Sequence, residues 1–307
     1  MKLLVLTLTL LVVTGCAPST ETTSGAATSR QVHACAYSAG SGPTTVPTRV
    51  ADAVYVLSIA GGNVVVSRGT DGLVVVDPRV PAVAEVLEAF SPDTPRTVID
   101  THSHRDHTSG NGAVVRAPGE IFAHDAVKAR LVVPQIFKGS PVAVAPAVDW
   151  PTRTYSDRLQ LHLNGDDIEL VHPAGAHTDG DTVVIFSKAH VVAMGDIFFP
   201  DRFPYVDPDA GGRVDALVVA IDGFVRAWPE DMRIIPGHGR SVCTMVDLRK
   251  YQTMLHDSLY WIGAGRRAGL SLDRMLVRGA PAAYKGWAWP LVDEKLWVSL
   301  VASSGGV

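Results

Sequence analysis

The sequence has little cysteine, little charge and few aromatic side chains. Three cysteines occur in 307 residues, and charged and aromatic residues make up 19% and 7%. Three cysteines are too few for a disulfide scaffold or for thiolate zinc knuckles. The 27 basic and 31 acidic residues leave a net charge of −4 and form no block of one sign. This balance argues against a nucleic-acid groove and against a polybasic membrane patch.

What the chain has in quantity is apolar residues and histidine. Hydrophobic residues make up 47%, and 11 histidines outnumber the 3 cysteines. The chain is too hydrophobic to be disordered and has enough apolar surface for a large buried core. One α/β layered domain can reach this length. We therefore expect one globular domain that uses imidazole chemistry.

The first sixteen residues have the pattern of a bacterial export signal. Lys2 is followed by an apolar run over Leu3 to Val13, which is too short to span a bilayer. Val13-Thr14-Gly15-Cys16 then resembles the lipobox, where cleavage leaves a lipidated cysteine. We predict a signal peptide over residues 1–15 and lipidation of Cys16. The lipid would anchor the protein to a membrane of the bacterial cell envelope, facing the periplasm or the exterior. An ordinary secretory signal with an incidental cysteine is the alternative.

Residues 16–48 are rich in Ser, Thr, Ala, Gly and Pro. Such a segment buries too little apolar surface to fold, so we predict a lipidated, flexible tether. Cys35 in this tether and Cys243 in the body are the two remaining cysteines. In an oxidising envelope they can form a disulfide. The sequence leaves the paired and the unpaired state open.

From about residue 49 the chain changes to β-branched runs separated by turn residues. The predicted strands are Val54–Ile59, Asn63–Ser67, Leu73–Asp77, Arg96–Asp100, Ile121–Ala123, Leu159–Leu163, Ile168–His172, Thr182–Phe186, His190–Met194 and Arg233–Pro236. The predicted helices are Ala82–Phe90, Asp125–Val132 and Val214–Trp228. The first three strands read as an antiparallel meander. Sheets with helices outside both faces are the expected architecture.

Two regions depart from this pattern. Val133–Pro151 holds four prolines and little periodicity, which predicts an irregular loop of the kind that often serves as a lid. After a main domain over residues 49–246, residues 247–307 are predicted to form a helical extension packed on it. Tyr251, Leu255 and Ile262 keep helical spacing within that extension.

The segment Asp100 to His107, Asp-Thr-His-Ser-His-Arg-Asp-His, is the most informative part of the sequence. It follows a hydrophobic strand, and residues two apart in an extended chain point the same way. His102 and His104 are therefore expected to face one side of that strand. Asp106 and His107 follow at the strand end, where α/β folds place ligands. A solvated polar turn is the alternative.

Three further candidate ligands lie at other strand ends, each beside glycine. His177 lies in Gly-Ala-His-Thr-Asp-Gly-Asp, Asp196 follows Gly195, and His238 lies in Pro-Gly-His-Gly. Glycine lets the backbone turn tightly around a ligand. This recurrence favours a metal site built from distant segments. The other histidines, including His124, lack such a pattern and are expected to be ordinary exposed or core residues.

Together these residues resemble the metallo-β-lactamase superfamily. The resemblance runs from about Val54 to His238 and covers the strand that ends at Asp77, the histidine block and the three later ligands. It implies an α/β fold, a four-layered αββα sandwich with a two-metal site at one edge. One metal would be held by His102, His104 and His177, and the other by Asp106, His107 and His238. Asp196 would bridge both, Asp77 would brace the loops, and Asp106 is also assigned a catalytic role.

Imidazoles and carboxylates suit two Zn²⁺ ions, with iron or manganese as alternatives. Such ions lower the pKa of water to about 7 and so supply a hydroxide nucleophile at neutral pH. We expect a dinuclear metal-dependent hydrolase of a small acyl substrate: an ester, a thioester, a lactone or a lactam, β-lactams included. The alternatives are iron-dependent thiol oxidation and a non-catalytic metal-binding lipoprotein.

Differences between this sequence and named members of the superfamily reduce the range of reactions that it is expected to catalyse. Asp196 stands where cysteine-containing lactamases would place a thiolate, and the basic exosites of nucleic-acid-processing relatives are missing. Arg202 and Tyr205 follow Asp196 closely. Arg202 is predicted to dock a substrate carboxylate and Tyr205 to donate to an oxyanion. Surface ion pairing of Arg202 and rim packing of Tyr205 are the alternatives.

Overall fold

The computed structural model describes residues 46–115 and 117–304. The predicted signal peptide, Cys16, Cys35 and most of the predicted tether lie outside these residues, so they remain predictions. Cys243 is buried. Among the described helices, none combines the length and the apolar character that a membrane span needs.

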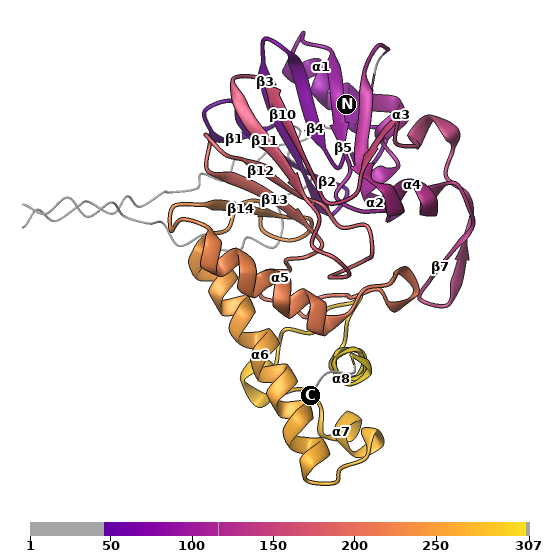
Figure 1. Ribbon diagram of the computed structural model, residues 1–307, viewed down its shortest axis with the longest axis vertical. Coiled ribbons are helices and arrows are strands. Elements are labelled where there is room, and N and C mark those ends of the chain that lie inside the picture. The colour runs from indigo at the N-terminus through magenta and orange to yellow at the C-terminus, as the bar shows by residue number, and fades with distance from the viewer. Residues whose placement is uncertain (1–45, 116, 305–307) are drawn as a thin grey trace, which may run out of the picture. The chain divides into compact units, whose positions relative to one another are not determined.

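Two β-sheets form the centre of the fold (Figure 1). The first sheet has the order β1-β2-β3-β4-β5-β6-β9, with bounds Thr48–Ala51, Val54–Ile59, Gly62–Gly69, Gly72–Val76, Pro95–Ile99, Glu120–His124 and Arg153–Tyr155. The second has the order β10-β11-β12-β13-β14, with bounds Arg158–Leu163, Asp166–Val171, Val183–Phe186, Val191–Gly195 and Arg233–Pro236. Strands β2 to β4 pair antiparallel, as the predicted meander requires. The pairs β4–β5, β5–β6, β6–β9 and β13–β14 are parallel, so both sheets are mixed.

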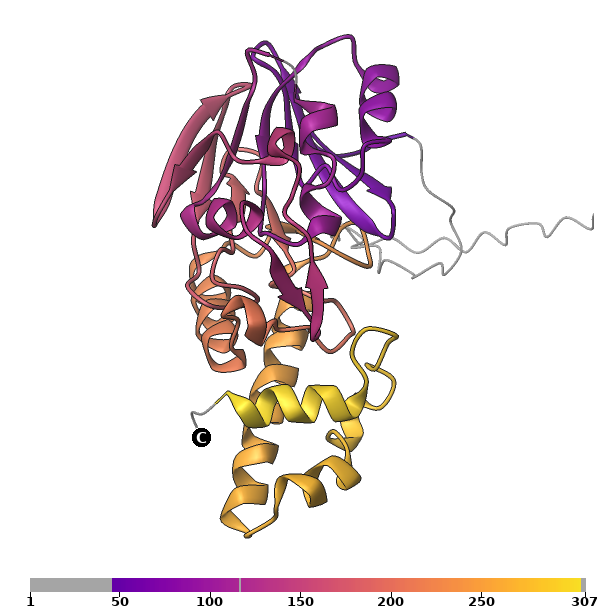
Figure 2. The ribbon, with the colours of Figure 1, turned by 90° about the vertical axis from the view of Figure 1, so that its right-hand side faces the viewer.

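Helices cover the outer face of each sheet (Figure 2). On the side of the first sheet lie α1, α2, α3 and α4, with bounds Val83–Phe90, Arg105–Thr108, Asn111–Val114 and Asp125–Leu131. The second sheet is covered by α5 (Val214–Ala227) and α6 (Met245–Arg267), and α7 (Leu272–Arg278) and α8 (Glu294–Ser303) follow. The layers are therefore helix, sheet, sheet and helix. The predicted four-layered αββα sandwich is confirmed.

Strand β3 shows why the sequence forms two covered sheets. Val64 and Val66 point to the outer face and pack against α1 and α3, whereas Val65 points into the layer between the sheets. Successive side chains of a strand point to opposite faces, so a strand covered on both faces reads as an unbroken apolar run. Each such fully buried side chain stabilises the fold by roughly 1.5–3 kcal/mol.

The C-terminal helices pack on α5 and on each other. Trp297 of α8 is fully buried. Its ring stacks on Phe203, with centroids 5.5 Å apart, and its Nε1 donates to Ser258 Oγ of α6 at 3.0 Å. Helix α6 begins with a capping box, in which Thr244 and Asp247 bond each other's backbone N–H groups. The contacts of Trp297 join α8 to α6 and to the loop that holds Phe203.

The expectation of an irregular loop over residues 133–151 is wrong. Strands β7 (Gln135–Phe137) and β8 (Ser140–Val142) form an antiparallel hairpin, and the 3₁₀ helix η1 (Ala147–Asp149) follows. Lys138 and Gly139 make the two-residue turn, both with positive φ, which is the geometry that tight hairpins prefer. Strands of three residues are too short to show a period, so the hairpin has no signal in the hydrophobic pattern. The short strand β9 was missed for the same reason.

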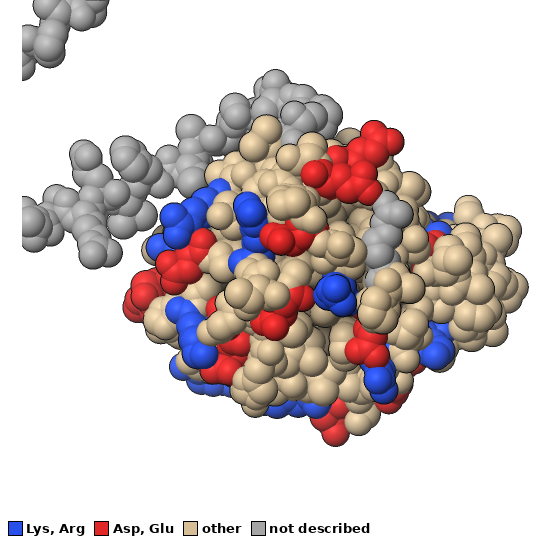
Figure 3. Space-filling view, turned by 90° about the horizontal axis from the view of Figure 1, so that it is seen from above, with Lys and Arg blue, Asp and Glu red and all other residues tan. Residues whose placement is uncertain are grey.

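The molecular surface carries both signs of charge. On the face seen in Figure 3, lysine and arginine side chains lie interspersed with aspartate and glutamate, without a large block of either sign. Many of the charges are paired, as in Arg68 with Asp93 and Arg153 with Glu120. This arrangement agrees with the mixed charge pattern along the sequence.

Candidate metal centre

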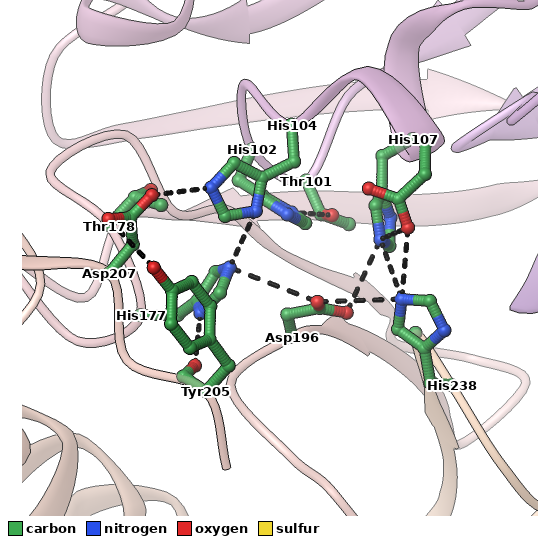
Figure 4. Close-up of polar contacts among 12 residues, drawn as sticks. Thr101, His102, His104, His107, His177, Thr178, Asp196, Tyr205, Asp207 and His238 are labelled. Atoms are coloured by element: carbon green, nitrogen blue, oxygen red, sulfur yellow. Dashed lines mark hydrogen bonds and ion pairs between the residues drawn. The ribbon is translucent and has the colours of Figure 1, made fainter. Parts of the chain in front are cut away.

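The predicted ligands converge at one edge of the sandwich, where strands of both sheets end (Figure 4). They come from the turn after β5, helix α2, the loop between β11 and β12, the end of β13 and the turn after β14. The seven residues are His102, His104, Asp106, His107, His177, Asp196 and His238. The structure therefore brings together all seven residues that the sequence proposed as ligands.

The turn after β5 differs from its expected geometry. β5 ends at Ile99, and residues 101–103 form a bend, so the prediction that His102 and His104 share the face of an extended strand is wrong. The two rings still meet edge to face, with centroids 4.7 Å apart. His104 is the N-cap residue of α2, whose first turn directs Asp106 and His107 to the same place.

The first cluster consists of three histidines and a carboxylate: His102, His104, His177 and Asp196. One ligand atom from each lies within 4.8 Å of the others. His177 Nε2 is 3.1 Å from His104 Nδ1 and 3.8 Å from Asp196 Oδ2. His102 Nε2 is buried and has no hydrogen-bond partner among the described residues. A buried acceptor without a donor is costly, and a cation would satisfy it.

The second cluster consists of Asp106, His107 and His238. His238 Nε2 is 3.1 Å from Asp106 Oδ2 and 3.3 Å from His107 Nε2, and those last two atoms are 3.5 Å apart. Tetrahedral zinc with bonds of about 2.0–2.1 Å separates its ligand atoms by roughly 3.3 Å. The spacing and the donor types therefore fit a divalent metal.

Asp196 contacts both clusters. Its Oδ2 is 3.8 Å from His177 Nε2 of the first cluster and 3.5 Å from His238 Nε2 of the second, and its Oδ1 is 3.3 Å from His107 Nε2. Room for this carboxylate exists because Gly237 has no side chain: a Cβ there would lie 2.2 Å from Asp196 Oδ1. The two clusters thus share one anion, which offsets the repulsion between two neighbouring cations. The arrangement is consistent with a dinuclear metal site.

Hydrogen bonds on the far side of each ring decide which nitrogen faces the cluster. His104 Nε2 donates to Asp207 Oδ2 at 2.8 Å, and His107 Nδ1 donates to Asp77 Oδ2 at 2.8 Å. His177 Nδ1 donates to the carbonyl of Tyr205 at 2.6 Å, and His238 Nδ1 to that of Gly61 at 2.9 Å. Such outer acceptors fix the tautomer and orientation of a metal-binding histidine.

His102 is oriented through a chain of two hydrogen bonds. Thr101 Oγ1 donates to Asp77 Oδ2 at 2.7 Å, so its hydroxyl proton is committed. It then accepts from His102 Nδ1 at 3.0 Å, which leaves the Nε2 lone pair facing the cluster. Asp77 also accepts from the Thr101 backbone N–H at 2.8 Å. Asp77 therefore lies behind the ligands and ties the turn after β5 to His107.

Two residues at the site were missed from the sequence. Asp207, 1% exposed, lies in the loop after Tyr205, where a lone aspartate before proline gives only a turn signal. Arg79 is a buried arginine 2.9 Å from Asp106, and in the sequence it reads as a loop residue after β4. Neither belongs to a histidine pattern, so only the tertiary structure reveals them.

The charges of the site are strongly coupled. Burial lowers the pKa of His102, and burial together with His104 lowers the pKa of His177 to about 4, so both rings are neutral at pH 7. Burial also acts to lower the pKa of His107, but Asp106 and Asp196 outweigh it and raise that pKa to about 10. Burial opposes ionisation of Asp196, yet His238 and His107 hold its pKa well below the usual range.

A cavity of about 610 Å³ opens onto the clusters. His104, Asp106, Asp196 and His238 form its polar end. Its walls are apolar and come from the β7–β8 hairpin and from a C-terminal segment: Ile136, Phe137, Val142, Trp289, Pro290 and Leu291. Lys138 Nζ donates to the carbonyl of Leu291 at 2.9 Å and so ties the hairpin to that segment.

The two residues predicted to contact the substrate lie differently with respect to the cavity. Tyr205 lines the cavity, and its hydroxyl lies 3.4 Å from Asp207 Oδ1. Burial, followed by the charge of Asp207, raises the pKa of Tyr205. Arg202 is not among the residues that line the cavity, and its guanidinium lies 5.3 Å from the ring centroid of Trp289.

Comparison with known proteins identifies the family to which this chain is similar. The family model described as "Metallo-beta-lactamase superfamily" matches residues 59–245. The chain is 30% identical over 125 residues to the 2,4-dinitroanisole O-demethylase subunit alpha of Nocardioides sp. (strain JS1661), or 40% of this chain and 35% of that protein. It is 32% identical over 110 residues to the hydroxyacylglutathione hydrolase of Anaeromyxobacter dehalogenans (strain 2CP-C), or 36% of each. The chain thus covers about a third of the length of these two curated relatives.

A solved structure shows the same fold. The metallo-beta-lactamase from Pontibacter korlensis matches with a TM-score of 0.57 at 15% identity, over 69% of this chain and 98% of that one. At this identity the likeness concerns the fold alone. The matched fold is the αββα sandwich that the sheets and helices show.

Metal binding at the second cluster should release about one proton at pH 7, and binding at the first about none. His107 carries a second ring proton, and so a positive charge, in the metal-free protein because its pKa is about 10. His102 and His177 are neutral. Titration calorimetry with zinc, in buffers of different ionisation enthalpy, measures the protons released at each step.

The same shift fixes the sign of the pH dependence. The His107 pKa is raised above its unfolded value of 6.5. The imidazolium therefore stabilises the metal-free protein fully below about pH 6.5, and this stabilisation is lost as the pH rises through about 10. Metal affinity of the second cluster should rise over the same interval. Proton release that is equal at the two steps would contradict this assignment.

Asp207→Asn should weaken metal binding at the first cluster by about 10-fold or more, because the charge behind His104 is lost while the shape is kept. Asp231→Asn is the matched control, since Asp231 accepts from His190 at 2.9 Å and neither residue belongs to a ligand cluster or lines the cavity. Competition with a fluorescent zinc chelator gives both affinities. Equal loss in the two variants would show that the Asp207 contact has no specific effect.

Proposed function

Because the chain belongs to the metallo-beta-lactamase superfamily, we propose that it is a zinc-dependent hydrolase of small neutral acyl substrates that carry an apolar group. Esters, thioesters, lactones and lactams, β-lactams included, are the bonds that it cleaves. The observation that carries this proposal is that both ligand clusters open onto one largely apolar cavity.

The donor set favours zinc over other divalent ions. Five imidazoles and two carboxylates form the clusters, and neutral imidazole with carboxylate is a set that zinc binds well in tetrahedral geometry. When bound, zinc supplies Lewis-acid chemistry: it lowers the pKa of a coordinated water to about 7 and polarises a substrate carbonyl. No serine, cysteine or threonine nucleophile is then required.

The chain's own residues hold and orient the reacting groups. Asp196 and Asp106 reach the cavity as carboxylates, so they accept hydrogen bonds from the attacking water and orient its lone pair. The side chain of Asp106 is 55% exposed, whereas that of Asp196 is 7% exposed. Asp106 is therefore the more solvent-exposed of the two carboxylates. Tyr205 stays protonated at neutral pH because burial raises its pKa, so its hydroxyl is a hydrogen-bond donor beside the cavity.

The charged side chains around the cavity argue for a neutral substrate. Arg130 forms a two-pronged ion pair with Asp179, with N···O distances of 2.7 and 2.6 Å. Arg105 pairs with Asp149 at 3.0 Å. Both cations among the described lining residues are thus committed to carboxylates. Apart from the metal ions, an anionic substrate would meet Asp106, Asp196 and Asp207 without a compensating side-chain cation.

One curated relative supports the acyl class. Its name gives hydroxyacylglutathione as the substrate of that protein, and 32% identity over 110 residues links it to this chain. The substrate of this chain is a proposal that rests on its own cavity. For the N-terminus we propose a lipid anchor at Cys16, which would place the hydrolase on the bacterial cell envelope.

Zinc-loaded protein should cleave at least one class in a panel of chromogenic esters, thioesters, lactones and lactams, and a chelator should abolish the activity. His104→Ala and Asp196→Ala should reduce turnover to background, because each removes a ligand atom from the clusters. His190→Ala is the control, since His190 lies outside both clusters and outside the cavity. Activity that survives both ligand substitutions, or that is insensitive to the chelator, would refute a metal-dependent hydrolase.

Within the active class, kcat/KM should rise by about 4-fold for each CH₂ added to the acyl chain until the cavity is filled, because burying a CH₂ is worth about 0.8 kcal/mol. Ile136→Asn should flatten this dependence, since Ile136 lines the cavity. Val219→Asn changes a comparably exposed apolar residue on α5 that does not line it. A chain-length profile that is flat in the unsubstituted protein would rule out an apolar acyl site.

A further inference from the structure

Arg79 is a buried guanidinium placed against the second ligand cluster only. Its side chain is 1% exposed. Nη2 lies 2.9 Å from Asp106 Oδ2, and Nη1 lies 3.2 Å from His107 Nε2. These two atoms are also the ones that face His238 Nε2 in the cluster. The arginine therefore contacts two of the three atoms that would bind the second metal.

The fold holds this guanidinium in place. The Arg79 backbone N–H donates to the carbonyl of His107 at 3.1 Å, although its φ of +43° is one that side-chain-bearing residues rarely adopt. A Cβ on Gly62 would lie 2.1 Å from Arg79 Cζ. Nη1 is also 3.5 Å from the carbonyl of Gly237. A backbone conformation and a glycine at position 62 are thus both adapted to this side chain.

Among the described residues, no arginine or lysine forms an ion pair with a ligand atom of the first cluster. Behind its three histidines the described partners are the hydroxyl of Thr101, the carboxylate of Asp207 and the carbonyl of Tyr205. All three accept a hydrogen bond from an imidazole N–H and so make the ring a better ligand. The second cluster has one such carboxylate, Asp77, but also the positive charge of Arg79. The electrostatic surroundings of the two clusters therefore differ.

We propose that Arg79 makes the two metal sites unequal, so that the first cluster binds its ion tightly and the second binds an exchangeable one. This inference rests on the metal binding of the proposed function. A guanidinium has donors only, so Arg79 cannot act as a metal ligand, and beside His107 it contributes its positive charge. It also neutralises Asp106 before any metal arrives. A second ion would therefore compete with the ion pair between Arg79 and Asp106 and meet a like charge in a poorly solvated place.

Two loading steps follow from this arrangement. At low free zinc the protein carries one ion, at His102, His104 and His177. At higher free zinc the second cluster would fill as well, with Asp106, His107 and His238 as the residues that would hold the ion. The free concentration of the metal thus decides whether the second cluster takes part in the chemistry.

The test measures zinc binding to the full chain by equilibrium dialysis against zinc buffers, with elemental analysis of the bound metal. The unsubstituted protein should bind two ions with dissociation constants at least about 10-fold apart. Arg79→Gln, which keeps a donor but removes the charge, should tighten the weaker site by about 10- to 100-fold and leave the tighter site unchanged. Arg79→Lys keeps the charge and should keep the two sites unequal.

Arg240→Gln is the matched control. Arg240 is a largely buried arginine whose described ion pairs are with Asp201 and Asp247, neither of which is a ligand of the clusters. It should leave both dissociation constants unchanged. Thermal unfolding of each metal-free variant shows whether it is folded. If Arg79→Gln is unfolded, the two dissociation constants are compared between Arg79→Lys and the unsubstituted protein instead.

The outcomes separate the two proposals. Two ions bound with equal affinity in the unsubstituted protein would overturn the inequality and leave the hydrolase proposal standing. A weaker second site in Arg79→Gln would overturn it as well, because Arg79 would then be a residue that positions Asp106 for the metal. No zinc bound by the unsubstituted protein would overturn the proposed function, and the inference with it.

Discussion

The candidate metal centre requires that several ligand atoms are held with their lone pairs directed at one small volume. Neutral imidazoles and carboxylates in close contact repel one another or compete for protons unless a cation lies among them. The hydrogen bonds on the outer nitrogens of His104, His107, His177 and His238 resist this repulsion, because each one fixes a ring in a single tautomer and direction. The acceptors of these bonds lie in loops that the two sheets hold at one edge.

The balance of charge at this edge is uneven. Asp196 contacts both clusters, Asp207 stands behind the first and Asp77 behind the second. Arg79 adds a positive charge on the second side alone. Two sites made of similar side chains can therefore differ in affinity for the same ion, because the groups behind the ligands differ. Ligand identity by itself does not fix the behaviour of such a centre.

The cavity is formed by the elements that have the weakest sequence signals. The β7–β8 hairpin supplies one apolar wall and the segment around Trp289 supplies another, and the contact of Lys138 with Leu291 joins them. The two walls are about 150 residues apart in the chain. Their apolar character limits the substrate more than the ligand set does, since the same ligands serve many reactions.

Local patterns in the sequence predicted the layered fold and the seven residues that the structure brings together. β-branched runs such as Val64 to Val66 specify strands covered on both faces, and histidines beside glycine at strand ends mark the site, because these signals are local. The three-dimensional fold was needed to show that His102 and His104 meet in a bend and that residues 135–142 form a hairpin. It also showed that Asp207 and Arg79 lie at the candidate metal centre. These features arise from contacts between segments far apart in the chain, and a pattern of neighbouring residues carries no record of such contacts.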